Sequence, residues 1–573
     1  MKFIRVDMKH LKITAQDVPK PYLGLGGRGL TSAIINAEVP PACDPMGPEN
    51  KLIFAPGALS GTMLVNTSRI SIGAKSPLTR GIKESNAGGN AGAALGRLGI
   101  AAIVIEGQTD KDPVHLLRVD AKGEVSLEPA PSLKGERTYA ATKKILDIYG
   151  KNNAVLVIGP AGETGLASAS VQVTDVDGRP CRAAARGGLG AVMGAKGLKA
   201  VVIDLKGENK NAAVDPEGFK AAARDFAKAI KAHPMTGQML PDLGTAGLVA
   251  PVNSMGAFPS LNATKGVMDG WEKISGETLV KLMKKRGGNP SHLGCSQCIV
   301  RCSNEFVDQN GQYVTSSLEY ETIWSMGGMT GIDDLDIIAQ LDRLCDDIGV
   351  DTMNTGVGIA VAMDAGKIAF KDGAAALGLV EEIAKNTRFG RILGTGPDAV
   401  GKHLNHHRIP TVRGQSIAAY DPRAMQGNAV TYATSPMGAD HTAGNVLGEY
   451  MTGALDPLKP DNQVEASRNT QIAMAAIDCT GLCLLASFTL TTPEGGEAFL
   501  RAMNARFGTS LGPDDIPAMG IRVLKEELEF NRKAGIRPED NRLPAFFYEE
   551  PLSPHNKVVE ITGAQMDSAL DFS

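Results

Sequence analysis

The sequence predicts an α+β protein in which a β-rich N-terminal domain is followed by two mainly α-helical domains. Short apolar runs between glycine and proline turns, typical of strands, fill residues 1–207. Beyond them, apolar residues recur at three- and four-residue spacing, which is typical of amphipathic helices. The polar segment 206–211 separates the β-rich part from the helical part, and a second boundary, between two helical parts, is expected near 408–416. We therefore expect domains at 1–207, 208–412 and 413–573.

The strands of the first domain are expected in short apolar runs at 51–55, 70–73, 101–106, 154–158 and 200–203. Two glycine-rich loops, at 85–92 and 185–194, interrupt them. Neither loop matches the fingerprint of a dinucleotide or nucleoside triphosphate site. Phosphates could still be held by their backbone N–H groups and by Arg69, Arg182 and Arg186. Plain turns are the alternative.

Helices are expected at 216–233, 276–286, 335–347, 377–386, 471–477, 495–507 and 516–534. Two helical patterns run into turns of the same form, Asp346–Asp351 and Asp478–Cys483, which read D-x-x-G, then an aliphatic residue, then Asp or Cys. Glycine there is expected to end the helix in a left-handed conformation. Two such turns suggest a two-fold related cofactor, held by exposed backbone N–H groups and acidic side chains.

Composition excludes several classes of protein. A net charge of −4 argues against nucleic acid as a partner. No run of about 18 uncharged apolar residues and no secretory h-region is present, so we expect a cytoplasmic protein without a membrane partner. The eight cysteines are too sparse and too clustered for a secreted disulfide framework.

The cysteine run Cys295, Cys298 and Cys302 is the strongest chemical signal. Its C-x2-C-x3-C spacing lets three thiolates converge on one metal centre, and Cys483 offers a fourth. Four thiolates suit a [4Fe–4S] cluster. Structural zinc, which prefers two paired ligands, and packing cysteines are the alternatives. His292, three residues before the run, is badly placed as a replacement ligand.

Further motifs occur in order along the chain, at 74–79, 85–89, 158–163, 186–194, 319–322, 419–423 and 432–435. With the cysteine run and the two D-x-x-G turns, they resemble the tungsten-dependent aldehyde:ferredoxin oxidoreductase family nearly from end to end. The resemblance implies oxidation of aldehydes with water to carboxylic acids at a tungsten bis-pyranopterin centre. Electrons would pass through a [4Fe–4S] cluster to ferredoxin or a ferredoxin-like partner subunit, and the N-terminal domain would form the base for the pterins.

The resemblance also implies roles for particular residues. Those matching contacts to the pterins and their phosphates are Arg69, Asn86, Gly88, Arg182 and Ala183 in the first domain, Asp346 and Asp351 for one pterin, and Asp478 and Leu482 for the other. Asn86 and Ala183 match the oxygens that help hold Mg²⁺ between the phosphates. Cys295, Cys298, Cys302 and Cys483 match the cluster ligands. Glu321 and His441 match an acid/base pair, although each alone would be an ordinary surface carboxylate or structural histidine.

The chain departs from the family pattern in two places. Gln340 and Arg343 stand where the family prototype bridges its dimer with an E-x-x-H metal site, so any homo-oligomer is expected to lack the bridging iron. Ala443 replaces a lysine near a pterin. The alternatives are a molybdenum variant, a catalytic subunit of a larger complex that reduces carboxylates or aromatic acyl thioesters, and a non-catalytic iron–sulfur or zinc scaffold.

Overall fold

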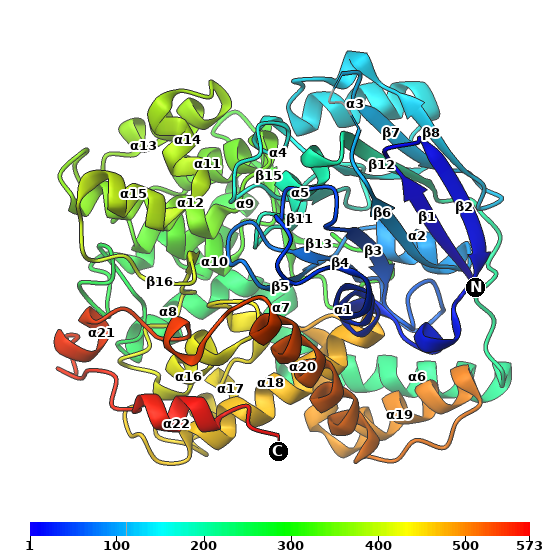
Figure 1. The fold of residues 1–573 in the computed structure, drawn as a ribbon. Helices are drawn as coiled ribbons and strands as arrows, with labels where there is room; N and C mark the ends of the chain where they lie inside the picture. The colour runs from blue at the N-terminus through cyan, green and yellow to red at the C-terminus, as the bar shows by residue number, and fades with distance from the viewer. Residues whose placement is uncertain (110–111, 573) are drawn as a thin grey trace.

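The computed structural model describes residues 1–109 and 112–572. Its N-terminal part holds two six-stranded sheets (Figure 1, blue to cyan), which confirms the β-rich first domain. The first sheet comprises β1 (Lys2–Asp7), β2 (Lys12–Asp17), β3 (Leu52–Pro56), β4 (Ile70–Lys75), β5 (Ile82–Ala87) and β6 (Ile100–Glu106). The second comprises β7 (His115–Val119), β8 (Val125–Pro129), β9 (Asn153–Val157), β10 (Val171–Val173), β11 (Arg182–Ala184) and β12 (Leu198–Asp204).

Helices of this part were not predicted, and they cover or connect the strands. They are α1 (Gly27–Glu38), α2 (Ala91–Arg97), α3 (Thr138–Tyr149), α4 (Pro160–Glu163) and α5 (Leu189–Ala195). The two glycine-rich loops lead into α2 and α5. There the absence of side chains lets the backbone approach the segment that leads into β4, since a Cβ at Gly92 would lie 2.4 Å from Ser68 O.

The chain then becomes mainly helical, as predicted. This segment contains α6 (Pro216–Ala232), α7 (Leu240–Leu243), α8 (Val249–Ser254), α9 (Gly276–Arg286), α10 (Tyr320–Ile323), α11 (Leu335–Ile348), α12 (Thr352–Asp364), α13 (Gly373–Ala384), α14 (Arg388–Thr395) and α15 (Pro397–Leu404). A small antiparallel sheet, not predicted, frames the cysteine run. It is formed by β13 (Asn289–His292), β14 (Ser303–Val307) and β15 (Tyr313–Ser316).

The C-terminal segment is also helical. It contains β16 (Thr411–Val412), β17 (Gln415–Ser416), α16 (Gln426–Thr434), α17 (Leu447–Met451), α18 (Gln463–Thr480), α19 (Pro493–Phe507), α20 (Asp515–Lys533), α21 (Phe546–Glu549) and α22 (Gly563–Ser568). Helix α6, which opens the middle segment, packs against α19 of this one (Figure 1). The exact domain boundaries stay predictions.

The two large sheets have the same topology. The first has the order β2-β1-β6-β3-β4-β5, and the second has the corresponding order β8-β7-β12-β9-β10-β11. Each contains one parallel pair, β1 with β6 and β7 with β12, among antiparallel neighbours. In each sheet, the strand that comes last in the sequence follows a short helix: β6 follows α2, and β12 follows α5. The N-terminal part therefore consists of two equivalent halves.

Each half receives one D-x-x-G turn. Gly349 and Gly481 end α11 and α18 in the left-handed region, with φ of 78° and 84°, which confirms the predicted helix ends. Arg69 N–H donates to Gly481 O at 3.2 Å. In the other half, Ser170 N–H donates to Gly349 O at 2.9 Å. The halves thus bind their turns by equivalent backbone contacts.

Glycine makes this close approach possible in both halves. A Cβ at Gly57, after β3, would lie 2.1 Å from Gly481 Cα. A Cβ at Gly159, after β9, would lie 2.1 Å from Ile348 O and 2.9 Å from Gly349 N. Any larger residue at either position would push the turn away from the sheet.

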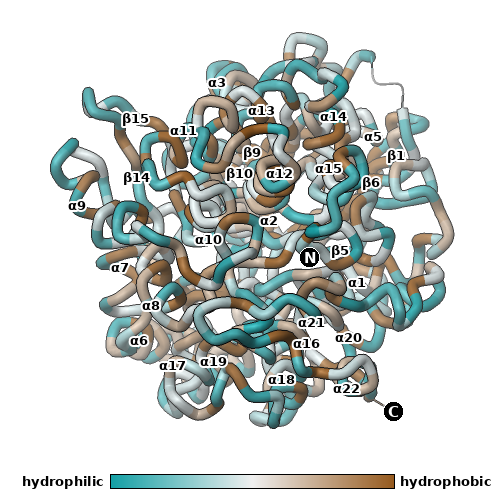
Figure 2. The backbone as a smooth tube through the Cα atoms, turned by 90° about the vertical axis from the view of Figure 1, so that its left-hand side faces the viewer, coloured by the Kyte–Doolittle hydropathy of each residue, from teal (hydrophilic) through white to brown (hydrophobic). Residues whose placement is uncertain are grey.

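The largest hydrophobic core lies in the helical segments, where α12 is buried from Met353 to Met363. A second core fills the space between the two sheets. Figure 2 shows hydrophobic residues spread in short stretches over many elements, without one long apolar segment. Accordingly, none of the helices in the described residues is long and apolar enough to cross a membrane.

Candidate functional site

A cavity of about 1150 Å³ lies where the two halves of the N-terminal part meet the helical segments. Its walls bring together twelve of the residues that the sequence singled out. These are Arg69, Gly88, Arg182, Ala183, Cys295, Cys298, Cys302, Glu321, Asp346, Asp351, His441 and Cys483. Residues more than 400 positions apart in the chain therefore share one enclosure.

Three predicted contacts do not reach the cavity wall. Asn86 lies behind Arg69, whose Nε donates to Asn86 Oδ1. The carboxylate of Asp478 accepts from Arg28 Nη1 at 3.3 Å, and burial, then the neighbouring Glu84, raises the pKa of Asp478 to about 7. Leu482 is 1 % exposed and belongs to a hydrophobic core. Apart from the thiol of Cys483, only backbone groups of this turn could contact a ligand.

The four cysteines of the predicted cluster site converge. All are unpaired thiols, three on the loop between β13 and β14 and Cys483 beyond the end of α18. Burial, then the neighbouring Cys295, raises the pKa of Cys298 to about 11. Burial also raises the pKa of Cys302, and the other three thiols add to the effect. Thiols that repel one another as anions are stabilised as thiolates by a bound metal, so the donor set fits a cluster.

Gly88, in the first glycine-rich loop, leaves room for this site. A Cβ there would lie 2.5 Å from Cys295 Sγ and 3.2 Å from Arg69 Nη1. The loop is tied to the cysteine run by a hydrogen bond from Ser296 N–H to Gly89 O, 3.1 Å. Gly88 therefore does more than form a turn. Because it has no side chain, the Arg69 guanidinium and the Cys295 thiol can both lie close to its backbone.

Arg182 stands on β11, facing the same cavity from the other half. Its Nη1 lies 3.4 Å from Glu319 Oε1, and its Nη2 donates to Ser303 Oγ. Its Nε is buried without a hydrogen-bond partner. A buried donor without a partner costs the folded protein about 1–3 kcal/mol. An anionic ligand such as a phosphate would remove this cost by accepting a hydrogen bond from Arg182 Nε.

The acidic residues of the first D-x-x-G turn form another wall. Burial raises the pKa of Asp342 to about 7, and burial, then Asp342, raises the pKa of Asp346 well above its usual range. A carboxyl held in its protonated form can donate as well as accept hydrogen bonds, as a heterocycle with ring nitrogens requires. Asp351 instead caps α12, accepting from Met353 N–H at 2.9 Å and Asn354 N–H at 3.3 Å.

Glu321 and His441 meet across the cavity. Glu321 Oε1 lies 3.3 Å from His441 Nε2, at the distance of an ion pair, and has no hydrogen-bond partner. Its Oε2 accepts from Ala419 N–H at 3.0 Å. Burial raises the pKa of Glu321, with His441 opposing the shift. A carboxyl of raised pKa that faces an imidazole is suited to accept and donate protons as a general base or acid.

Local structure fixes this pair. Glu321 lies in α10, which passes directly into a π-helical turn at Trp324–Gly328, an irregularity often found at functional sites. Tyr320 OH donates to Ala419 O at 2.8 Å, and Tyr432 OH donates to Tyr420 O at 3.1 Å. These two bonds hold the irregular segment after β17, whose Ala419 N–H contacts the carboxylate.

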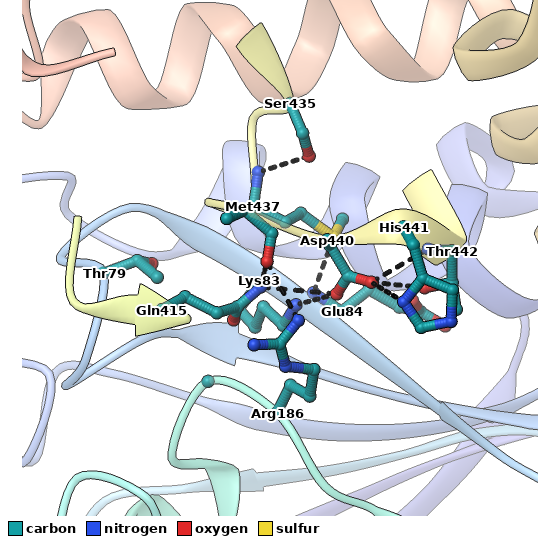
Figure 3. Close-up of polar contacts among 12 residues, drawn as sticks. Thr79, Lys83, Glu84, Arg186, Gln415, Ser435, Met437, Asp440, His441 and Thr442 are labelled. Carbon is teal, nitrogen blue, oxygen red and sulfur yellow. Dashed lines mark hydrogen bonds and ion pairs between the residues drawn. The ribbon is translucent and has the colours of Figure 1, made fainter. Parts of the chain in front are cut away.

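A buried ionic network stands behind His441 (Figure 3). Lys83 on β5 is 1 % exposed, and its Nζ lies 3.1 Å from Asp440 Oδ2. Gln415 Nε2 donates to the same oxygen at 3.3 Å, while Thr442 N–H and Oγ1 donate to Asp440 Oδ1 at 3.0 and 2.7 Å. Burial opposes this charge, but Lys83 and Arg186 outweigh it and hold the pKa of Asp440 well below its usual range.

Three residues of the site, Lys83, Asp342 and Asp440, carry no sequence pattern that assigns them to it. Lys83 and Asp440 are 357 positions apart, so no local pattern connects them. Lys83 lies in β5, whose polar sequence, IKESNA, is typical of a solvent-exposed edge strand. The one available signal was proximity, because Asp440 immediately precedes His441 and Asp342 precedes the first D-x-x-G turn by four residues.

The positions of the family's dimer-bridging site hold no metal ligands here. Gln340 donates its side-chain amide to Asp336 O at 3.1 Å on the exposed face of α11. Arg343 lies with its guanidinium carbon 3.3 Å from the ring centroid of Tyr139, and its Nη1 donates to Val314 O. Both side chains are engaged in structural contacts.

Comparison with protein families gives two matches that together span most of the chain. The model described as aldehyde ferredoxin oxidoreductase, N-terminal domain, matches residues 3–205. The model described as aldehyde ferredoxin oxidoreductase, domains 2 and 3, matches residues 221–571.

Individual proteins agree. The tungsten-containing aldehyde ferredoxin oxidoreductases of Pyrococcus furiosus and Thermococcus kodakarensis are each 32 % identical to the chain, over 96 % of it and 92 % of their own length. Among solved structures, the active-site complex BamBC of benzoyl coenzyme A reductase with 1,5-dienoyl-CoA has a TM-score of 0.82. At 19 % identity, covering 100 % of this chain and 93 % of that one, it shows a shared fold.

Proposed function

Because the chain belongs to the aldehyde ferredoxin oxidoreductase family of enzymes, we propose that it oxidises aldehydes to carboxylic acids at a tungsten bis-pyranopterin centre. The reaction, R–CHO + H₂O → R–COOH + 2H⁺ + 2e⁻, needs a site that handles both protons and electrons. The observation that carries the proposal is that one cavity is lined both by the acid/base pair, Glu321 and His441, and by the four cysteines.

The residues present fit the cofactor set of tungsten bis-pyranopterin, Mg²⁺ and a [4Fe–4S] cluster. Arg69 and Arg182, one from each half, would hold the phosphates. The turns at Asp346–Asp351 and Asp478–Cys483 would each hold one pterin, the second through its backbone groups. Ala183, which lines the cavity, would help to hold Mg²⁺ together with the backbone of Asn86, whose side chain is engaged by Arg69. The bound metal would supply a two-electron acceptor for the aldehyde.

The protein's own part in the chemistry is proton transfer. In its carboxylate form, Glu321 would accept a proton from the water that adds to the aldehyde, directly or through His441 Nε2 at 3.3 Å. Burial keeps the proton affinity of Glu321 high enough for this role. The aromatic rings of Tyr420 and Tyr320, 5.6 Å apart at their centroids, would exclude bulk water behind the pair.

Electrons would leave through the cysteine site. The turn that ends α18 reaches from Asp478, for the second pterin, to Cys483, for the cluster, within six residues. One short, backbone-tied loop would thus fix the distance between the two redox centres. Ferredoxin or a ferredoxin-like subunit in the cytoplasm would take the electrons, and a homo-oligomer would form without bridging iron.

Anaerobically purified protein with a viologen acceptor tests the proposal. Addition of aliphatic and aromatic aldehydes should reduce the viologen, with one carboxylic acid formed for two equivalents reduced. Absence of aldehyde-dependent reduction, in protein that carries tungsten and iron, would refute the proposed activity. Acid- or acyl-thioester-dependent oxidation of reduced viologen, without the forward reaction, would favour the reducing subunit of a larger complex.

A further inference from the structure

Asn66, in the N-terminal part, forms hydrogen bonds with both segments that carry the predicted cluster cysteines. It is 3 % exposed and adopts a left-handed conformation with φ of 60°. Its backbone N–H donates to Gln297 O at 3.2 Å, inside the cysteine run. Its carbonyl oxygen accepts from Cys483 N–H at 2.8 Å. The backbone of this one residue therefore links the two distant cysteine segments.

The side chain of Asn66 adds two further bonds to the same site. Its Oδ1 accepts from Ile299 N–H at 3.1 Å, and its Nδ2 donates to Cys298 Sγ at 3.3 Å. The sulfur also accepts from Arg301 N–H at 3.3 Å. An N–H donor to a ligand sulfur stabilises negative charge there, and such bonds help to set the reduction potential of a cluster.

The equivalence of the two N-terminal halves provides an internal comparison. Arg69 and Ser170 make corresponding contacts to the two D-x-x-G turns, and Ser168 O accepts from Asp351 N–H at 3.0 Å as Asn66 O does from Cys483 N–H, so Asn66 corresponds to Ser168. Cys483 is present only on the side of Asn66, because the other turn ends in Asp351. The amide side chain is thus found only in the half that faces the cysteines, and the general architecture does not need it.

We infer that Asn66 is a positioning residue for the iron–sulfur site, which it assembles from two chain segments and whose reduction potential it raises through the Nδ2–H···Sγ bond to Cys298. This inference rests on the proposed function, since it requires a cluster at the four cysteines. Asn66 touches neither substrate nor pterin in this account, so its effect should be on the cluster and on electron transfer.

The test is a redox titration of the cluster signal by electron paramagnetic resonance, with iron counted per chain, in three variants of the full-length protein. Asn66→Gly tolerates the left-handed backbone and removes both side-chain bonds. Asn66→Asp retains the acceptor for Ile299 N–H but replaces the N–H donor by a carboxylate oxygen. Asn262→Gly is the matched control, because Asn262 is fully buried, has φ of 53°, and donates to Asp364 Oδ2 and Arg408 O at 3.0 Å.

We expect the midpoint potential to fall from wild type to Asn66→Gly and further to Asn66→Asp, while Asn262→Gly keeps the wild-type value. A tenfold shift of the reduced-to-oxidised ratio at fixed ambient potential would appear as 59 mV for this one-electron couple. Loss of iron from a folded Asn66→Gly protein, with iron retained in the control, would equally support the assembly role. Wild-type potential and iron content in both Asn66 variants would overturn the inference. A wild-type protein without iron would instead overturn the proposed function.

Discussion

Replacing Glu321 by Gln should remove the proton acceptor of the proposed reaction and leave the cavity intact. The amide has the volume of the carboxyl group, and its oxygen can still accept from Ala419 N–H, which Glu321 Oε2 contacts at 3.0 Å. What is lost is the charge beside His441 Nε2. We therefore expect unchanged iron and tungsten content and an unchanged unfolding midpoint.

The size of the effect follows from the distance between the two groups. At 3.3 Å and an effective dielectric constant of about 20, a carboxylate and an imidazolium attract by about 5 kcal/mol. This is an upper limit for the stabilisation of a protonated His441, and it corresponds to a factor of several thousand in rate. Loss of a general acid or base usually costs about 10²- to 10⁴-fold, so kcat should fall within that range.

The assay is aldehyde-dependent viologen reduction between pH 5 and 9, normalised to bound tungsten. Because burial raises the pKa of Glu321, kcat/KM of the wild type should fall as the pH drops through that pKa and the carboxylate is protonated. Glu321→Gln should lack this acid limb. Glu319→Gln, which alters a carboxylate paired with Arg182 at 3.4 Å, should keep the limb and lose less than tenfold. Retention of the acid limb in Glu321→Gln, or equal losses in both variants, would refute the assigned role.

Three further changes test other parts of the site. Gly88→Ala should lower the iron content, since the new Cβ would lie 2.5 Å from Cys295 Sγ; four iron atoms with an unaltered spectrum would contradict this. Asp342→Asn should raise the unfolding midpoint of cofactor-free protein more at pH 8 than at pH 5. Burial raises the pKa of Asp342 to about 7 from 3.8, so ionisation above pH 7 costs the folded state up to about 4 kcal/mol, a cost that disappears as the pH falls; an equal gain at both pH values would contradict the shift. Arg301→Glu should raise KM for ferredoxin and leave the viologen assay unchanged, because Arg301 is exposed beside Cys298; equal losses with both acceptors would exclude Arg301 from docking.

Local sequence patterns predicted the elements that carry the chemistry. The left-handed Gly349 and Gly481 ends of α11 and α18 follow from glycine after a helical period. The convergence of Cys295, Cys298 and Cys302 follows from their spacing. These features are determined by residues close together in the chain, so a single sequence reveals them, whereas Cys483, far downstream, was assigned through the family resemblance.

The rest depends on contacts between distant segments. The equivalence of the two N-terminal halves escaped detection because corresponding positions differ, as Arg69 and Ser170 do, while their backbone contacts agree. Strand β13 was missed because Asn289–His292 has no alternating apolar pattern and contains a proline. The burial of Lys83 against Asp440 depends on a partner 357 positions away. Tertiary context decides such cases.

Elemental analysis of protein purified without oxygen shows whether the cavity and its four cysteines hold the proposed metals. We expect about four iron atoms and one tungsten atom per chain, and one molybdenum atom in place of tungsten would identify the metal variant of the same site. Zinc alone, with neither iron nor a pterin metal, would contradict the redox site at Cys295, Cys298, Cys302 and Cys483 and with it the proposed oxidation of aldehydes.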